Sequence, residues 1–290
     1  MTALIARRPM LAGSLFAGSL LVLPAFANDA AKSFAEVEAR NGGRLGVAAL
    51  DTASGRALGH RTDERFPMCS TFKFLLAALV LARVDRGQER LDRRIVFSEK
   101  DLESYSPVTK GHVGTPGMSL AELCDATVTL SDNTAANLLL AQFGGPGALT
   151  TFARELGDEL TRLDRIEPAL NESMPGDPRD TTTPAAMLAD MRRLLVEQAL
   201  STASRAQLVA WLIGCKTGDK RLRAGFPADW RIGDKTGSGE RGSANDIAIA
   251  WPPARAPILV TAYYTGSTID EPARSRVIAE VGRLAVAGLA

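Results

Sequence analysis

The chain has 290 residues, and its 34 basic and 33 acidic residues give a formal net charge of +1. Because the charges balance and no lysine- or arginine-rich tract is present, nothing in the composition indicates nucleic acid or a membrane surface as a partner. The length suits one large domain or two closely packed domains with an ample core.

The first residues have the features of an export signal. Arg7 and Arg8 precede an uncharged stretch, and the tripeptide AFA at 25–27 has the small-x-small form that signal peptidase cleaves. We therefore expect residues 1–27 to be a cleaved signal peptide and the mature protein to be periplasmic or secreted. The arginine pair leaves the twin-arginine export route open beside the general route. A retained membrane anchor is the alternative, although glycines and a proline interrupt the apolar stretch.

Two short strands are predicted near the start of the mature chain. Residues 44–50 and 56–60 are rich in apolar residues, and the turn sequence DTASG at 51–55 separates them. This arrangement is typical of a β-hairpin. From about residue 70 to 213 the apolar pattern is helical.

Helix-boundary signals divide this helical region. Ser119 and Glu122 form a capping-box pattern, and Thr183 followed by Pro184 predicts a helix start. Gly214 is expected to end the helix that precedes it, as a glycine at a helix C-terminus often does.

Strand patterns return after about residue 219. Segments 230–237, 246–251 and 258–264 are predicted strands, separated by turns that contain glycine or proline. The residues DEP at 270–272 then predict the cap of a final amphipathic helix.

Strands at both ends of the chain around a helical middle predict an α+β protein. We expect a three-layer α/β/α sheet domain formed by residues 28–66 and 214–290, with an all-α domain, residues 67–213, inserted between the two parts. A ligand site is expected in the cleft between the two domains.

The stretch MCSTFK at 68–73 opens the first helical pattern. Ser70 and Lys73 share a face of its first turns, and the run at 74–82 is apolar all round, which predicts a buried helix. A serine hydroxyl becomes a nucleophile when a base takes its proton, and a lysine kept neutral by burial can be that base. The alternative is a serine that caps the helix beside a lysine whose ammonium reaches solvent.

Two further motifs follow along the chain, SDN at 131–133 and KTG at 235–237. In this order, S-x-x-K, S-D-N and K-T-G are typical of class A β-lactamases and penicillin-binding proteins. The stretch RLDRIEPALNE adds Glu167, Leu170 and Asn171, whose E-x-x-L-N spacing resembles the omega loop of class A β-lactamases. The alternative for this stretch is a surface loop with unrelated charges.

The resemblance extends over essentially the whole mature chain, because YSPVTKGH, SDNTAANLLL and DTTTPAAML also resemble that family. KTGSG followed by NDIAIAWP resembles its extended-spectrum cephalosporinase branch. The resemblance implies a β-lactamase/transpeptidase-like serine hydrolase fold. It also implies hydrolysis of the β-lactam amide bond of penicillins and cephalosporins, which gives antibiotic resistance.

The resemblance implies a role for each catalytic residue. Ser70 would attack the lactam carbonyl and become acylated, while Lys73 and Glu167 would share the general-base work. Which of these two takes the serine proton stays open, whereas Glu167 would activate the water that deacylates the enzyme. Asn171 would help to hold that water, and Ser131 would relay a proton to the lactam nitrogen.

The resemblance also implies the groups that bind the substrate. The backbone N–H groups of Ser70 and Ser238 would form an oxyanion hole for the lactam carbonyl. The remaining predicted residues would hold the rest of the molecule: Lys235, Thr236 and Ser238 at its carboxylate, Asn133 at its side-chain amide, and Tyr105 as a wall of the cleft.

Arg221 resembles an arginine that some family members supply to the carboxylate site. Many members carry such an arginine on the strand after K-T-G, but the corresponding stretch here reads GSAN at 242–245. The alternative for Arg221 is a solvated surface arginine.

No metal or other cofactor is expected, because the chain has only two histidines and no C-x-x-C motif. The three cysteines are Cys69, Cys124 and Cys215. The resemblance implies that all three thiols are free, since the bridging partners found in relatives correspond here to Ala77 and Gly239.

Two other functions stay open on the sequence alone. One is a D,D-peptidase that acts on peptidoglycan, although such an enzyme would have no use for Glu167 and Asn171. The other is a penicillin-binding sensor domain that is acylated without turnover, which would normally be tethered to a membrane segment, and no stretch after residue 28 could span a bilayer. We expect a monomer that acts on small-molecule β-lactams, with no membrane association after signal cleavage.

Overall fold

A computed structural model describes residues 28–289 of the chain. The expected signal peptide therefore lies outside the described residues. Within the described range, no helix is long and apolar enough to cross a membrane.

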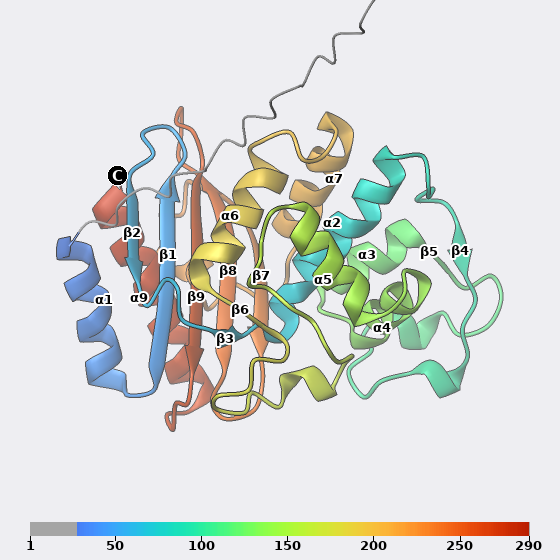
Figure 1. The fold of residues 1–290 in the computed structure, drawn as a ribbon, viewed down its shortest axis with the longest axis horizontal. Helices are drawn as coiled ribbons and strands as arrows, with labels where there is room; N and C mark the ends of the chain where they lie inside the picture. Colours follow the sequence, from blue (N-terminus) through green and yellow to red (C-terminus); the bar gives the residue numbers. More distant parts are fainter. Residues whose placement is uncertain (1–27, 290) are drawn as a thin grey trace, which may run out of the picture.

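The centre of the fold is a five-stranded antiparallel sheet with the strand order β2-β1-β9-β8-β7 (Figure 1). The predicted hairpin and the three predicted C-terminal strands are all present in this one sheet. The strand bounds are Arg44–Asp51 for β1, Ala57–His60 for β2, Arg231–Ser238 for β7, Ala244–Trp251 for β8 and Ile258–Thr265 for β9.

The two ends of the described chain meet in the sheet. β1 pairs with β9 along its whole length, from Arg44 opposite Thr265 to Asp51 opposite Ile258. The N-terminal hairpin is thereby joined to the C-terminal strands, as expected for a sheet built from both termini.

Helices cover both faces of the sheet and give the three α/β/α layers that the sequence predicted. Figure 1 shows the sheet between α9 on one side and α6 on the other. The first face carries α1 (Asn28–Asn41), α8 (Leu222–Gly225) and α9 (Glu271–Leu289), and the second carries α6 (Pro184–Leu195) and α7 (Thr202–Ile213).

Because both faces are covered, the sheet strands are buried almost throughout and do not alternate between apolar and polar residues. Neighbouring side chains of β9 enter two different cores. Tyr263 belongs to the cluster that includes Met187 of α6, whereas Tyr264 belongs to the cluster that includes Val281 of α9. The helix α1 has no counterpart among the predicted elements, and it packs here through Phe34.

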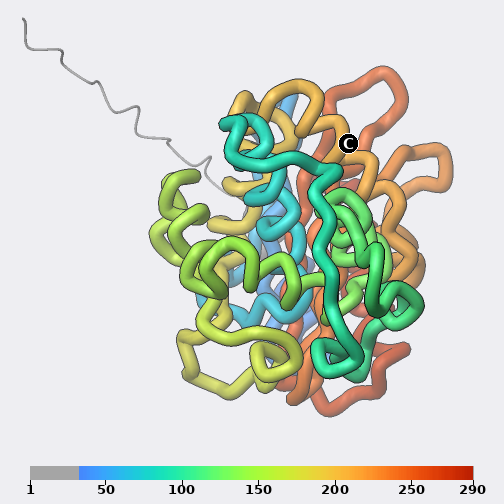
Figure 2. Tube along the Cα trace, turned by 90° about the vertical axis from the view of Figure 1, so that its right-hand side faces the viewer, coloured from blue at the N-terminus to red at the C-terminus, as the bar shows by residue number. Residues whose placement is uncertain are grey.

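The helical part of the chain lies beside the sheet, and Figure 2 views the molecule from that side. Its longest helix is buried, as predicted, since every residue from Phe72 to Ala82 is inaccessible or nearly so. The helices are α2 (Phe72–Asp85), α3 (Leu120–Thr129), α4 (Asn133–Gln142) and α5 (Pro146–Glu155).

Short strands and single 3-10 turns connect these helices. Two-residue strands pair as β3 (Phe66–Pro67) with β6 (Thr181–Thr182), and as β4 (Arg94–Ile95) with β5 (Met118–Ser119). The 3-10 turns are η1 (Cys69–Thr71), η2 (Glu99–Asp101), η3 (Thr109–Gly111) and η4 (Ala169–Asn171).

The predicted helix caps are confirmed, but Gly214 ends its helix for a different physical reason from the one expected. Ser119 and Glu122 form both bonds of a capping box, and the Thr183 side chain accepts from the backbone N–H of Ala186. Gly214 ends α7 as predicted, but its φ of −69° is one that any residue adopts. Glycine is favoured there by packing, because a Cβ would lie 3.1 Å from the Thr129 side chain, which would have to shift.

Two buried carboxyl groups lie close together in the interior: Asp158, three residues after the end of α5, and Asp190 on α6. Asp190 of α6 is fully buried, and neither of its oxygens has a hydrogen-bond donor among the described residues. Its closest cation, Arg193, lies at 4.0 Å. Asp158 accepts the backbone N–H groups of Leu160 and Thr161 with one oxygen, while its other oxygen also lacks a donor. Burial, and secondly the Asp158 carboxylate, raise the pKa of Asp190 well above its ordinary value.

Replacement of Asp190 with asparagine should stabilise the protein at neutral pH. A carboxyl group whose pKa is raised by folding contributes its full stability below its unfolded pKa, and this contribution is lost as the pH rises toward the folded pKa. Asp190→Asn removes this loss and provides a donor for Asp158, so we expect a gain of about 1–3 kcal/mol at pH 7 and little gain near pH 4. Thermal unfolding between pH 4 and 8 measures the difference, and a variant that is less stable than the parent at every pH would contradict the raised pKa of Asp190.

Candidate active site

Ser70 lies in the turn η1, directly before α2. It is 9% exposed, and its Oγ donates to Glu167 Oε1 at 3.0 Å. No side chain caps η1 or α2, so the alternative in which Ser70 serves as a helix cap is wrong. The Ser70 hydroxyl is therefore held by a carboxylate and is free of any capping role.

Lys73 is fully buried one turn further along α2. Its Nζ lies 2.9 Å from Glu167 Oε1 and donates to the Ser131 carbonyl at 2.8 Å and to Asn133 Oδ1 at 2.6 Å. The alternative in which the ammonium reaches solvent is wrong. Burial lowers the pKa of Lys73, and the Glu167 carboxylate opposes this effect.

Glu167 joins the segment 160–183 to the start of α2. Its carboxylate is buried, with Oε1 facing both Ser70 and Lys73, and Oε2 accepting from the Asn171 amide. The predicted E-x-x-L-N spacing places both side chains together because Asn171 ends the 3-10 turn η4, which begins two residues after Glu167. Asn171 therefore holds the same Glu167 carboxylate that accepts from Ser70.

Asn137, which the sequence did not single out, fixes the backbone of Glu167, and Glu103 in turn holds Asn137. Asn137 on α4 accepts the Glu167 N–H at 3.0 Å and donates to the Glu167 carbonyl at 2.9 Å. The same Asn137 amide donates to the Glu103 carboxylate at 3.0 Å. Asn137 follows the SDN motif in the same helix, but its contact with Glu167 spans 30 residues and has no local sequence signal.

The SDN motif places Ser131 between two lysines. Its Oγ lies 3.4 Å from Lys73 Nζ and 3.1 Å from Lys235 Nζ. Asp132 is fully buried and caps α4 through the Ala135 N–H, while it also binds the segment around Thr109. The motif thus uses its aspartate for structure and presents its serine to the lysines.

The side chains around Ser131 complete this part of the site. Asn133 uses its side-chain oxygen for Lys73, and its backbone N–H donates to the Tyr105 carbonyl at 3.0 Å. Tyr105 is 48% exposed, so its ring is available to a ligand.

The KTG motif lies on the edge strand β7. Lys235 is fully buried, and burial lowers its pKa to about 8. The Thr236 hydroxyl bonds the Thr217 hydroxyl. At Gly237 a Cβ would lie 2.8 Å from the Met68 carbonyl oxygen and 3.2 Å from the Ser70 nitrogen, so only glycine lets β7 approach the nucleophile's turn this closely.

Arg221 lies beneath the end of β7 and is only 6% exposed. Its guanidinium donates to the carbonyls of Gly237 at 2.6 Å and Asn245 at 2.8 Å, and to Ser238 Oγ at 2.6 Å. Burial lowers its pKa. The alternative of a solvated arginine is therefore wrong, and the guanidinium contacts the end of the strand that carries KTG.

The three cysteines are buried and free. Burial raises the pKa of Cys69 to about 12 and of Cys215 to about 11, and it also raises the pKa of Cys124. In the described part of the chain, no group of three or more histidine, cysteine or acidic side chains could hold a metal ion.

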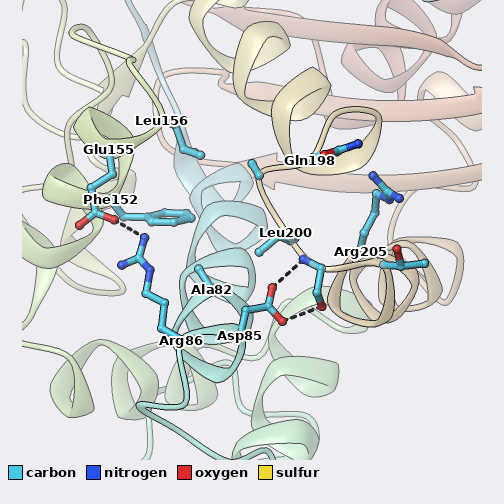
Figure 3. A pocket seen from close by; sticks show the side chains of 12 residues that line it. Ala82, Asp85, Arg86, Phe152, Glu155, Leu156, Gln198, Leu200 and Arg205 are labelled. Atoms are coloured by element: carbon cyan, nitrogen blue, oxygen red, sulfur yellow. Dashed lines mark hydrogen bonds and ion pairs between the residues drawn. The ribbon is translucent and has the colours of Figure 1, made fainter. Parts of the chain in front are cut away.

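A cavity of about 640 Å³ lies at the other end of α2 and contains none of the predicted site residues. Its charged groups are mostly satisfied within the chain. Figure 3 shows Arg86 directed at Glu155, which lies at 2.7 Å, and Asp85 accepts the N–H and hydroxyl of Ser201 at the start of α7. This cavity is therefore not the catalytic site.

The whole chain resembles known β-lactamases. Its sequence matches the β-lactamase enzyme family over residues 29–289. Among the relatives, β-lactamase L2 of Stenotrophomonas maltophilia is 52% identical over 257 residues, which are 88% of this chain and 84% of that protein. β-Lactamase CTX-M-8 of Citrobacter amalonaticus is 47% identical over 276 residues, which are 95% and 94% of the two chains. The solved structure of the ancestral GNCA class A β-lactamase has a TM-score of 0.88 and 67% identity, and the match covers 89% of this chain and 99% of that chain.

The chain belongs to the β-lactamase enzyme family. Its relatives and structural neighbours make it a class A serine β-lactamase, a hydrolase that opens the β-lactam ring and gives antibiotic resistance. The D,D-peptidase and sensor alternatives are not favoured by these relatives.

The thiols should be unreactive in the folded protein, because each is buried and burial raises its pKa. At neutral pH each thiol therefore stays protonated, whereas the thiolate is the reactive form. Under non-reducing conditions, a thiol reagent should find three groups after denaturation and react far more slowly before it. A count of one group after denaturation would mean that a disulfide joins two of the cysteines.

Proposed function

We propose that Ser70, Lys73, Ser131 and Glu167 carry out β-lactam hydrolysis through an acyl-enzyme. The observation that supports this proposal best is the position of the Glu167 carboxylate, which is buried 3.0 Å from Ser70 Oγ and 2.9 Å from Lys73 Nζ. A base within hydrogen-bond reach of a serine hydroxyl is the geometry that nucleophilic catalysis requires.

In the acylation step, Ser70 Oγ attacks the lactam carbonyl carbon as its proton leaves to a base. Glu167 is in direct contact with that proton, and Lys73 can serve once it is neutral, which its lowered pKa favours. The C–N bond of the ring then breaks, and the nitrogen needs a proton. Ser131 can donate its own proton to that nitrogen and recover one from Lys73 or Lys235, which both lie within hydrogen-bond reach.

In the deacylation step, a water attacks the ester carbonyl on Ser70. Glu167 takes a proton from that water, and Asn171 fixes the carboxylate from its other oxygen. The water oxygen bonds to the acyl carbon, the ester bond to Ser70 Oγ breaks, Glu167 returns the proton to Ser70 Oγ, and the opened product leaves. Asn137 acts as a positioning residue, because it holds the backbone on both sides of the Glu167 Cα.

Substrate binding uses the groups around β7. The backbone N–H groups of Ser70 and Ser238 would hold the lactam oxygen, while Lys235, Thr236 and Ser238 would bind the substrate carboxylate. Because Ser238 Oγ already accepts from Arg221, its proton is free to be donated to that carboxylate. Arg221 therefore supports the carboxylate site through Ser238.

The opposite wall of the site would recognise the substrate side chain. Asn133 gives its oxygen to Lys73, so its N–H₂ group remains for the amide of the substrate. Tyr105 would pack against the same side chain, and we expect both penicillins and cephalosporins to be turned over.

We further propose that residues 1–27 form an export signal and that the mature chain is a periplasmic or secreted monomer. The mature chain would consist of a sheet domain, residues 28–66 and 214–290, and a helical domain, residues 67–213, with segment 160–183 as its omega loop. Intact mass of the exported protein and its sedimentation velocity would test the cleavage site and the monomer.

Replacement of Glu167 with alanine tests the proposed mechanism. A well-placed general base typically contributes about 10²–10⁴-fold to its step, so Glu167→Ala should hydrolyse penicillin that much more slowly. Because Lys73 remains beside the serine, the acyl-enzyme should still form and accumulate as an adduct visible by intact mass.

Ser70→Ala is the matched control, and it should show no adduct. Turnover of penicillin by Glu167→Ala at the parent rate would remove Glu167 from the mechanism. A long-lived adduct on the unmodified protein would contradict rapid deacylation.

Loss of the Lys235 proton should lower the activity of the enzyme at alkaline pH. Its pKa of about 8 means that the ammonium is present below pH 8 and is lost above it, so binding of a carboxylate should weaken in that range. We expect kcat/KM, which reports the free enzyme, to fall about tenfold per pH unit above pH 8. Lys235→Arg keeps its charge and should lose this fall, whereas a parent profile that is flat to pH 9.5 would contradict the role of Lys235.

A further inference from the structure

A second cavity is lined in part by the omega loop. It has a volume of about 350 Å³ and is formed between loop residues 173–179, the β3 strand and the turn that contains Gly266. None of Ser70, Lys73, Ser131 or Glu167 lines it.

Among the charged side chains that line this cavity, cations outnumber anions. The acidic residues are Glu64 and Asp177, whereas the basic residues are Arg44, Arg65, Arg165, Arg179 and Arg241. Three of the arginines are neutralised by ion pairs of 2.6–2.7 Å: Arg44 with Glu64, Arg165 with both Asp180 and Glu172, and Arg179 with Asp177.

The other two arginines have no anionic partner among the described residues. Arg65 uses its Nη1 for neutral acceptors, the Leu160 carbonyl at 2.8 Å and the Thr181 hydroxyl at 3.0 Å. These bonds fix the guanidinium against the loop and leave Nε and Nη2 free. The Arg241 side chain forms no hydrogen bond or ion pair with any residue that the structure describes, so all its donors remain available.

The cavity also has an apolar wall. Pro67, Leu170, Met174 and Pro175 line it beside the arginines, and Met174 is 41% exposed. A volume of this size accommodates a small molecule, and a combination of apolar surface with a few charged groups is typical of ligand sites.

We propose that this cavity is a binding site for a phosphate group, carried either by a small soluble molecule or by a lipid headgroup. Guanidinium groups present paired N–H donors that match phosphate oxygens, and two uncompensated arginines match the charge of a dianion. The apolar wall would receive the organic part of a phosphate ester. The proposal does not depend on the catalytic roles assigned above, because it concerns binding alone.

Binding of inorganic phosphate to the purified protein tests the site. Thermal unfolding and isothermal titration are measured with increasing phosphate while sodium chloride keeps the ionic strength constant. We expect saturable binding with a rise in Tm, since a ligand that binds only the folded state stabilises it.

Arg241→Gln is the informative variant, because the Arg241 side chain has no hydrogen bond or ion pair with the described residues whose loss could disturb folding. Loss of a charge-assisted contact should weaken phosphate binding at least about tenfold. Arg65→Gln should do the same. Arg56→Gln is the matched control, since Arg56 is also an exposed arginine with no ion pair but lies in the β1–β2 turn outside the cavity.

The source of the phosphate is resolved by two further arms. Phenyl phosphate that binds more tightly than inorganic phosphate would support a small ester, and retention on phosphatidic acid vesicles but not on phosphatidylcholine vesicles would support a lipid headgroup. In both arms the binding must be lost in Arg241→Gln. Absence of saturable phosphate binding, or equal binding by the Arg241 and Arg56 variants, would overturn the proposal.

Discussion

The buried contact between Lys73 and Glu167 is the interaction on which the rest of the site depends. Taking two opposite charges out of water is costly, and their attraction compensates only if the other polar atoms are also satisfied. Here they are satisfied, because Lys73 also reaches the Ser131 carbonyl and Asn133 while the second oxygen of Glu167 is bound by Asn171. Removal of either partner leaves an uncompensated buried charge. The pair therefore ties the first turn of α2 to a loop that begins nearly 90 residues later in the chain.

The large elements of the fold bring three distant segments to this contact. The apolar helix α2 is enclosed by the helical part of the chain, so its first turn is held at the boundary with the sheet. The edge strand β7 reaches that turn only because Gly237 has no side chain. Arg221 then holds the end of β7 through two carbonyl groups and the Ser238 hydroxyl. The positions of Ser70, Lys235 and Ser238 are thus consequences of backbone packing more than of their own side-chain contacts.

The sequence predicted correctly those helices and strands whose formation depends on residues close to one another in the chain. The hairpin, the three C-terminal strands and the caps at Ser119 and Thr183 follow from turn residues and apolar patterns within a few positions. The motifs predicted which residues would meet, since Ser70, Lys73, Ser131, Glu167 and Lys235 form one connected group of contacts.

What the sequence could not predict rests on contacts between distant residues. Asn137 of α4 holds the Glu167 backbone and is itself held by Glu103, and the meeting of Asp158 with Asp190 depends on how α6 packs. Gly214 was predicted from its position at a helix end, but the reason for it is the nearby Thr129 side chain, 85 residues away in the chain. The first helix, α1, is explained by a core that exists only after the sheet has formed.

The pairing of β1 with β9 has a consequence for the order in which the protein can be made. An isolated two-stranded hairpin is at best marginally stable in water, so β1 and β2 gain little by pairing with each other alone. Their lasting partner, β9, comprises residues 258–265 and leaves the ribosome last among the strands. The five-stranded sheet can close only after residue 265 has been synthesised, and until then β1 lacks a neighbour on one edge. Until β9 has been made, a chain with this strand order cannot reach its final structure, and it stays open enough to be threaded through a narrow channel.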